Sequence, residues 1–206
     1  MNATELLDLC PVVPVVVLHD AADAVPLARA LTAGGLRVIE ITLRTPAALE
    51  AVERIAGEVE DAVVGAGTVV TPEQAARAAE AGARFLVSPG CTDRLRRAMT
   101  DTGLPFLAGV STASEAMALL EHDITAMKFF PAKAAGGPAY LKALAGPLPQ
   151  ARFCPTGGIT PETAGEYLAL PNVGCVGGTW LTPADAVRAK DWGRIEELAR
   201  AAAALR

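Results

Sequence analysis

Residues 124–131 read ITAMKFFP and place Lys128 inside an apolar run. Along a strand, period-two alternation puts Met127 and Phe129 on one face and Lys128 and Phe130 on the other, so we expect both faces to be covered. A lysine is rarely buried without a partner, and burial favours its neutral amine, which is a nucleophile. The segment therefore predicts a reactive lysine. The alternative is a strand-end lysine whose ammonium group extends to water.

A second polar set lies in residues 39–44, which read IEITLR. Alternation puts Glu40, Thr42 and Arg44 on one face and three large aliphatic residues on the other, and the aliphatic face should pack against helices. The polar face then points inward, where each group needs a partner. Glu40 and Arg44 could form a structural ion pair. Beside a buried lysine, however, Arg44 would favour the neutral amine and Glu40 could accept and return protons.

The composition limits what kind of protein this is. The 206 residues are 51% hydrophobic and contain no evident linker, so we expect one domain over residues 1–206. A net charge of -5 without a basic stripe argues against nucleic acid as a partner and favours a small-molecule ligand. Neither an apolar run of about 18 residues nor a basic leader is present, so we expect no membrane association and a cytoplasmic protein.

Cysteine and histidine do not form a recognisable metal or redox motif. The four cysteines lack C-x-x-C spacing, and the two histidines, His19 and His122, have only the adjacent Asp20 and Asp123 as nearby strong ligands. We therefore expect buried free thiols, no disulfide and no metal site.

A pattern of apolar run, turn and alanine-rich helical stretch repeats along the chain after a short opening helix at about residues 3–9. Eight apolar runs begin near residues 12, 37, 61, 84, 105, 124, 151 and 173. Each interval fits one strand and one crossover helix, which predicts an α/β fold, a (β/α)8 TIM barrel. An open doubly wound sheet is the alternative, but no G-x-G-x-x-G sequence opens the chain after the first run.

Expected helix boundaries agree with this repeat. A threonine suited to capping a helix follows four of the runs, at Thr71, Thr92, Thr112 and Thr160. Glycines suited to helix C-termini stand at Gly34, Gly35, Gly82 and Gly103.

In a barrel of parallel strands, chemistry takes place at the C-terminal ends of the strands. The third run ends GAGT at residues 65–68, and the fourth ends SPG at residues 88–90. The seventh and eighth are followed by PTGGI at residues 155–159 and GGTW at residues 177–180, which expose backbone amides. Loops in these two positions often bind phosphate, with a short helix that could begin at residues 183–185. Glycine used only for tight turns is the alternative.

Five runs together resemble the signature sequences of a known family. They are LRT at 43–45, VGAGTV at 64–69, SPG at 88–90, MKFFPA at 127–132 and RFCPTGGI at 152–159. The chain resembles, from about residue 11 to 198, the 2-keto-3-deoxy-6-phosphogluconate (KDPG) aldolase and 4-hydroxy-2-oxoglutarate aldolase family, whose members are class I, Schiff-base aldolases of the Entner–Doudoroff pathway.

The resemblance implies a homotrimeric (β/α)8 enzyme that reversibly cleaves KDPG to pyruvate and glyceraldehyde 3-phosphate with no metal or other cofactor. Lys128 would form an imine with the ketone carbon, and Glu40 would be the general acid and base. The chemistry of the residues agrees, because a protonated imine is an electron sink and Glu40 is the only acid within an expected strand interior.

The same resemblance assigns the substrate-binding positions. Arg44 and Thr68 would bind the pyruvyl carboxylate, Pro89 and Phe130 would line the pocket, and Thr156 would contact the substrate hydroxyls.

Phosphate would be bound by Gly157, Gly158 and Thr179. The family commonly has serine at the last of these positions, so Thr179 keeps the hydroxyl and adds a methyl group.

Three other functions remain open from the sequence. The same imine chemistry could act on 4-hydroxy-2-oxoglutarate, on the galactonate epimer or on oxaloacetate by decarboxylation. A phosphate-binding isomerase or synthase could use Glu40 as a base and Lys128 only as a charge. A non-catalytic sensor of phosphorylated metabolites would bind its ligand without turnover.

Overall fold

The computed structural model describes residues 1–205 and contains one eight-stranded parallel sheet. Consecutive strands from β1 to β7 are neighbours, and β8 pairs with β1. The (β/α)8 architecture predicted from the eight apolar runs is confirmed. The strands are β1 (Val12–Val16), β2 (Val38–Thr42), β3 (Val63–Gly67), β4 (Leu86–Val87), β5 (Phe106–Val110), β6 (Ala126–Phe129), β7 (Arg152–Pro155) and β8 (Val176–Gly178).

The barrel closes between β7 and β8. Two isolated parallel bridges connect the two strands with residues just outside them: Phe153 on β7 pairs with Val173, and Thr156 pairs with Gly177 on β8. The Phe153 N–H also donates to the Asn172 carbonyl at 2.8 Å. Closure brings strands that are far apart in the sequence to the same C-terminal rim.

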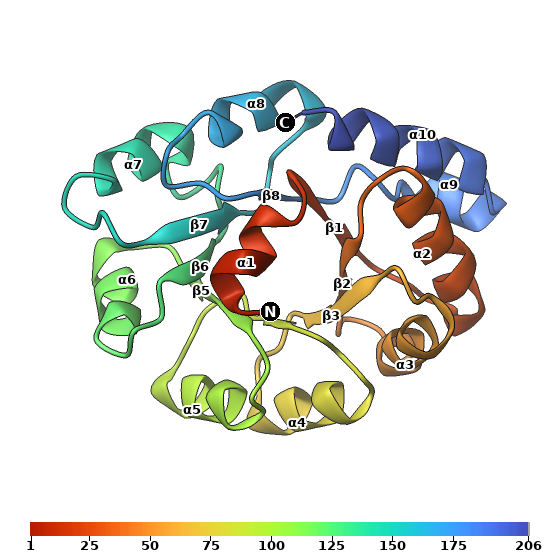
Figure 1. Cartoon of the computed structure of the whole chain (residues 1–206), viewed down its shortest axis with the longest axis horizontal. Coiled ribbons are helices and arrows are strands. Elements are labelled where there is room, and N and C mark those ends of the chain that lie inside the picture. The colour runs from red at the N-terminus through yellow and green to blue at the C-terminus, as the bar shows by residue number, and fades with distance from the viewer. Residues whose placement is uncertain (206) are drawn as a thin grey trace.

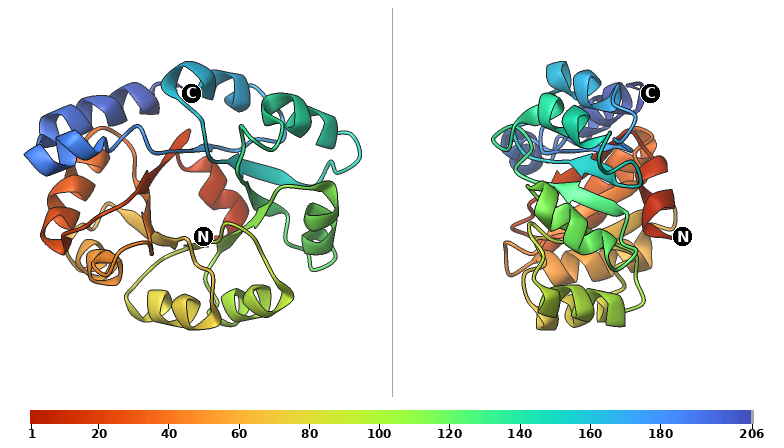
Figure 2. Two further views of the ribbon diagram at one scale, coloured as in Figure 1. Left: turned by 180° about the vertical axis from the view of Figure 1, so that it is seen from behind. Right: turned by 90° about the vertical axis from the view of Figure 1, so that its left-hand side faces the viewer.

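Helices surround the barrel as an outer ring (Figures 1 and 2). Their apolar faces pack against the strands, in keeping with the repeat that the sequence indicates. They are η1 (Ala21–Asp23), α2 (Ala24–Ala33), α3 (Ala48–Glu58), α4 (Pro72–Glu80), α5 (Asp93–Asp101), α6 (Ala113–Leu120), α7 (Gly137–Leu144), α8 (Pro161–Leu168), α9 (Ala184–Ala189) and α10 (Trp192–Ala203).

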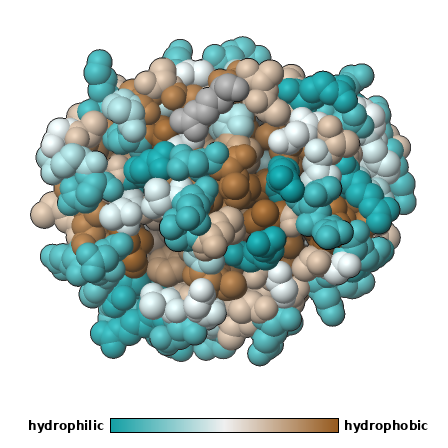
Figure 3. Space-filling model, viewed as in Figure 1, coloured by the Kyte–Doolittle hydropathy of each residue, from teal (hydrophilic) through white to brown (hydrophobic). Residues whose placement is uncertain are grey.

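The opening helix α1 (Ala3–Asp8) lies across the N-terminal end of the barrel (Figure 1). Leu6 and Leu7 are buried beneath it, and the Asp8 carboxylate accepts two hydrogen bonds, at 2.7 and 3.0 Å, from Arg152 at the start of β7. In the space-filling view of this face, hydrophobic residues are visible between hydrophilic ones near the centre (Figure 3). The helix therefore covers the end of the barrel opposite the rim where chemistry is expected.

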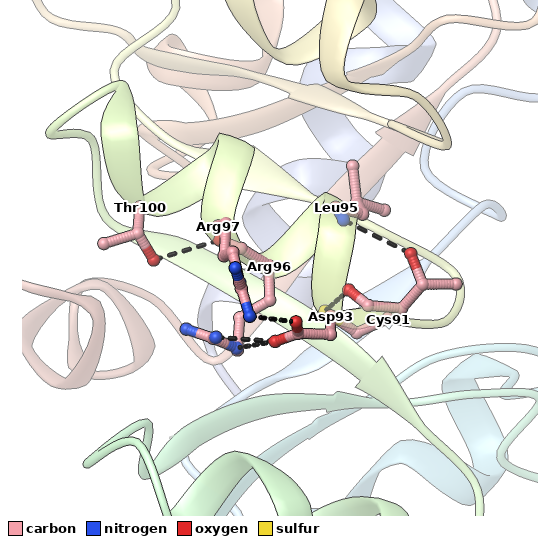
Figure 4. Close-up of polar contacts among 7 residues, drawn as sticks. Cys91, Asp93, Leu95, Arg96, Arg97 and Thr100 are labelled. Atoms are coloured by element: carbon pink, nitrogen blue, oxygen red, sulfur yellow. Dashed lines mark hydrogen bonds and ion pairs between the residues drawn. The ribbon is translucent and has the colours of Figure 1, made fainter.

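The predicted helix boundaries are largely confirmed. The hydroxyls of Thr71, Thr92 and Thr112 accept from backbone N–H groups in the first turns of α4, α5 and α6. At the start of α5 the Asp93 carboxylate also binds Arg96 and Arg97 (Figure 4). The expected C-terminal glycines Gly35, Gly82 and Gly103 have positive φ, where a side chain would be strained.

Two strands are shorter than the apolar runs suggest. β4 spans only two residues, because Pro89 lacks an N–H and cannot continue the ladder beyond Ser88. β8 begins at Val176 rather than near residue 173, although Val173 forms an isolated bridge with Phe153, and Gly174 lies against α1. A Cβ built on Gly174 would lie 2.6 Å from the Leu7 Cβ.

All four cysteines are free, and Cys10, Cys154 and Cys175 are buried as expected, whereas Cys91 is half-buried. Within residues 1–205, no helix is long and apolar enough to cross a membrane.

Burial raises the pKa of the Cys10 thiol from 9.0 to about 12. Between these values the folded protein keeps a proton that the unfolded chain has lost, so the free energy of unfolding should fall as pH rises. One such group contributes up to about 1.4 kcal/mol per pH unit. We expect the difference in unfolding free energy between wild type and Cys10→Ala to shrink by roughly 1 kcal/mol from about pH 9 to about pH 10. Urea denaturation of both proteins at both pH values measures this difference in unfolding free energy. A difference that does not change with pH would contradict the raised pKa of Cys10.

Candidate active site

The site centres on an ion pair between two strands on opposite sides of the barrel. The Lys128 ammonium on β6 lies 3.3 Å from Glu40 Oε1 on β2, and each side chain is 4% exposed. In register, Lys128 lies between Gly109 on β5 and Cys154 on β7. Lys128 is therefore buried as its apolar flanks predict, with Glu40 as its ion-pair partner.

The carboxylate of Glu40 has room because Gly67 lies beside it on β3. A Cβ built on Gly67 would overlap Glu40 Oε1. Gly65, two residues earlier, leaves room for the Phe85 ring, whose atoms would lie 2.5 Å from a Cβ at that position. The sequence predicts small residues here, but not that one of them makes space for the acid.

Phe130 provides an aromatic wall for the amine. Its ring centroid lies 5.5 Å from the Lys128 Nζ, within the range of a cation–π contact. A Cβ on Gly157 would lie 3.3 Å from the same ring, so the β7–α8 loop packs directly against Phe130. The structure thus brings Lys128, Phe130 and the first glycine of that loop together, as their placement after neighbouring strands predicts.

Arg44 follows β2 and donates from Nε to the Thr68 hydroxyl at 3.1 Å. Thr68 has a φ of 59°, an uncommon and strained conformation for a β-branched residue. The alternative ion pair between Glu40 and Arg44 is not formed among residues 1–205, where Glu40 pairs with Lys128 instead. Arg44 is exposed and has no carboxylate partner in the same part of the chain. Its guanidinium is available to an anion at the rim.

Thr42 has a structural contact. Its hydroxyl is fully buried and donates to the Val16 carbonyl on β1 at 2.9 Å. Thr45, just beyond, donates to the Leu18 carbonyl. Both hydroxyls join the second strand and its loop to the first.

Pro89 is held at the rim by close backbone packing. A Cβ on Gly109 would overlap the Pro89 carbonyl group, and the Gly109 N–H donates to the Ser88 hydroxyl at 3.2 Å. The residues that follow are fixed by the capped start of α5 (Figure 4). Burial raises the pKa of the Cys91 thiol there to about 11, so this cysteine is a poor nucleophile near neutral pH.

Thr156 lies inside the barrel, 5% exposed, next to β8. A Cβ on Gly177 would overlap its hydroxyl, so the side chain fits only over a glycine. Gly157 and Gly158 follow with φ of 103° and 76°, which favour glycine and turn the chain sharply at the rim.

Thr179 is exposed and lines a cavity of about 540 Å³ at the β1–β8 side of the rim. The lining also includes His19, after β1, and Arg188, on α9. Sequence reasoning did not select these two residues, because neither lies in a motif and α9 is brought to β1 only by closure of the barrel.

A metal centre has no candidate ligands in the described part of the chain: no group of three or more His, Cys, Asp or Glu residues is arranged to hold a metal ion. The groups present are a buried amine, a carboxylate, a guanidinium without a carboxylate partner and a glycine pair with positive φ.

Comparisons with known proteins identify the family of the chain. Residues 3–198 match the aldolase family described as KDPG and KHG aldolase. A KHG/KDPG aldolase of Escherichia coli K12 is 52% identical over 201 residues, covering 98% of this chain and 94% of that protein. A 2-dehydro-3-deoxy-phosphogluconate aldolase of Pseudoalteromonas atlantica is 54% identical, covering 99% and 95%.

A solved structure of a KDPG aldolase has the same fold as this chain. The KDPG aldolase of Legionella pneumophila, with pyruvate captured at low pH as a covalent carbinolamine intermediate, superposes with a TM-score of 0.96 at 46% identity and covers 98% of both chains. The sequence and the fold thus agree, and this chain belongs to the KDPG and KHG aldolase family.

Proposed function

We propose that this protein is a class I aldolase that reversibly cleaves KDPG to pyruvate and D-glyceraldehyde 3-phosphate, working as one (β/α)8 domain. The observation that carries the proposal is the buried Lys128 beside Glu40 at the centre of the barrel. Glu40 is placed to take a proton from the Lys128 ammonium, and the neutral amine that results can attack a ketone. The Legionella relative, in which pyruvate is bound as a covalent carbinolamine, supports the same chemistry.

The first half of the reaction forms an imine. The Lys128 amine attacks the C2 ketone to give a carbinolamine, which loses water as a proton is delivered to its hydroxyl. Glu40 lies 3.3 Å from the amine and is the group placed to carry that proton.

The second half breaks the bond between C3 and C4. Glu40 removes the proton of the C4 hydroxyl, the aldehyde leaves, and the electron pair of the broken bond passes into the protonated imine to give an enamine. Protonation at C3 and hydrolysis of the imine then release pyruvate and the free amine of Lys128.

The two ends of the substrate fit the two ends of the site. Arg44, fixed by Thr68, would bind the carboxylate through charge-assisted hydrogen bonds. Pro89 and Phe130 would enclose the pyruvyl carbons, and Thr156 would contact the substrate hydroxyls.

The phosphate would lie at Gly157, Gly158 and Thr179. Positive φ at the two glycines turns backbone at the rim, and Thr179 adds a hydroxyl from the neighbouring loop. The additional methyl of Thr179 would narrow this end of the pocket.

Cleavage of 4-hydroxy-2-oxoglutarate is a second candidate activity. The family description includes KHG aldolase, and the E. coli relative is named for both activities. Only the phosphate end of the site would be left unused by this substrate, because the imine and carboxylate contacts are shared.

Assembly and compartment are part of the same proposal. A homotrimer follows from the resemblance to the family, and light scattering of the purified protein would measure it. The four free thiols support a cytoplasmic location, because thiols stay reduced in that compartment.

Trapping tests the reaction class directly. Incubation with pyruvate and borohydride should add one pyruvyl-sized group to the peptide that carries Lys128, because borohydride reduces the imine to a stable amine. Lys128→Ala should show no addition by intact mass and peptide mapping. If the folded wild type is not modified while a control aldolase is trapped, the Schiff-base mechanism is wrong, and an isomerase that uses Lys128 as a charge becomes the better hypothesis.

Glu40→Gln should lower turnover by roughly 10² to 10⁴, the usual contribution of a general acid or base. Trapping of pyruvate on Lys128 should survive in part, because the amine itself remains. Steady-state cleavage and borohydride trapping measure the two effects separately. Unchanged turnover would remove Glu40 from the mechanism.

Gly67→Ala should lower turnover by roughly 10²-fold, because the new methyl group displaces the Glu40 carboxylate. Gly57→Ala is the matched control, since a Cβ at Gly57 on α3 has no atom within 4 Å. Turnover of both variants, with circular dichroism to verify folding, measures the effect. Equal turnover in the two variants would show that the position of Glu40 does not depend on Gly67.

A further inference from the structure

The loops that follow β6 and β7 are joined along their backbones at the rim. The Ala132 N–H donates to the Thr156 carbonyl at 2.8 Å, and the Lys133 N–H donates to the Gly157 carbonyl at 3.0 Å. These bonds hold Lys133 directly beside the glycine pair to which the proposed function assigns the phosphate.

The side chain of Lys133 covers the second glycine. A Cβ built on Gly158 would lie 2.7 Å from the Lys133 Cβ and 3.1 Å from its Cδ. The Lys133 methylenes therefore run along Gly158. The ammonium nitrogen is two bonds beyond Cδ, which itself lies beside the glycine loop. A substituent at position 158 would push this side chain away.

The charge of Lys133 is not neutralised by the protein. Among residues 1–205, Lys133 takes part in no ion pair, and its side chain makes no hydrogen bond. From residue 124 to residue 161 the sequence contains no Asp or Glu, although the whole chain has 23 acids against 18 Lys and Arg residues. This acid-free segment includes β6, β7 and both loops. An anion at the glycine pair would meet a local excess of positive charge.

The other cations of the segment are not available to a ligand at the rim. Lys128 is paired with Glu40 inside the barrel, and Arg152 is paired with Asp8 at the opposite end. Lys142 lies in the last turn of α7, which leads away from the rim. Lys133 is the cation of this segment that is both at the rim and without a partner.

We propose that Lys133 is a specificity-determining residue whose ammonium group binds the phosphate of the substrate held at Gly157 and Gly158. The inference rests on the proposed function. A phosphate monoester carries about -1.5 to -2 charge at neutral pH, which backbone amides offset only in part. An ammonium group at the loop raises affinity for phosphorylated ketoacids and adds nothing for ligands without phosphate.

The test compares Lys133→Met, which keeps the length and apolar stem, with the control Lys142→Met. The KM for KDPG should rise about 5- to 30-fold in Lys133→Met, the scale of a hydrogen bond to a charged group partly screened by solvent. The kcat should change less than about threefold, and half-saturation of borohydride trapping by pyruvate should change less than about twofold. Lys142→Met should keep the wild-type KM, and Lys133→Arg should restore most of it.

Salt provides a second readout. The KM of the wild type should rise more steeply with ionic strength than that of Lys133→Met. Lys133→Gln serves if the Met variant does not fold. A KM for KDPG that changes less than about fivefold in the folded variant, or an equal loss for KDPG and pyruvate, would overturn the role of Lys133. If wild-type protein traps no pyruvate at Lys128, the proposed function itself fails, so the two failures are distinguishable.

Discussion

The buried ion pair between Lys128 and Glu40 is the constraint on which the rest of the structure depends. Taking an ammonium and a carboxylate out of water costs several kcal/mol per ion, and removing one partner of a buried pair typically costs about 3 to 5 kcal/mol. The two residues are 88 positions apart, and only closure of the barrel brings them to 3.3 Å. Stability alone is a weak reason for such a pair, since apolar replacements of similar volume are often as stable. The proposed function gives a better reason, because in it the pair would hold a nucleophile and a proton carrier side by side.

The glycines inside the barrel follow from that pair. Gly67 leaves the space that the carboxylate occupies, Gly109 lets the Pro89 loop approach β5, and Gly177 accommodates Thr156. A barrel filled only by branched side chains would be a packed core. Here large residues such as Phe85 fill part of the interior, and small ones keep polar side chains near the C-terminal rim. The lower conformational stability of glycine in strands is the cost of this space.

Local patterns predicted the fold and the burial of Glu40 and Lys128, because both depend on short-range periodicity. Alternation along β2 and β6 placed Glu40 and Lys128 inward, and eight similar units left one main way to close the sheet. The pairing of Arg44 with Thr68 was implied only by the resemblance to the family, because it depends on a left-handed Thr68 that local patterns do not reveal. The early end of β4 follows from Pro89, which the sequence shows, whereas the late start of β8 depends on tertiary contacts of the residues before it. His19 and Arg188 line one cavity between the first and last units of the barrel, an arrangement that no local pattern contains.

The two anionic ends of the proposed substrate are treated differently, and the difference has a physical reason. The carboxylate is attached to the carbon that would form the imine, so its proposed partner needs a defined position; Arg44 donates to a hydroxyl on strained backbone, which would help to orient the guanidinium. The phosphate lies away from the bond that breaks, and there backbone amides and a flexible lysine can supply affinity without exact geometry. A rigid contact next to the chemistry and an adaptable one at the far end would let a single barrel cleave a phosphorylated ketoacid and still process a shorter one that lacks the phosphate.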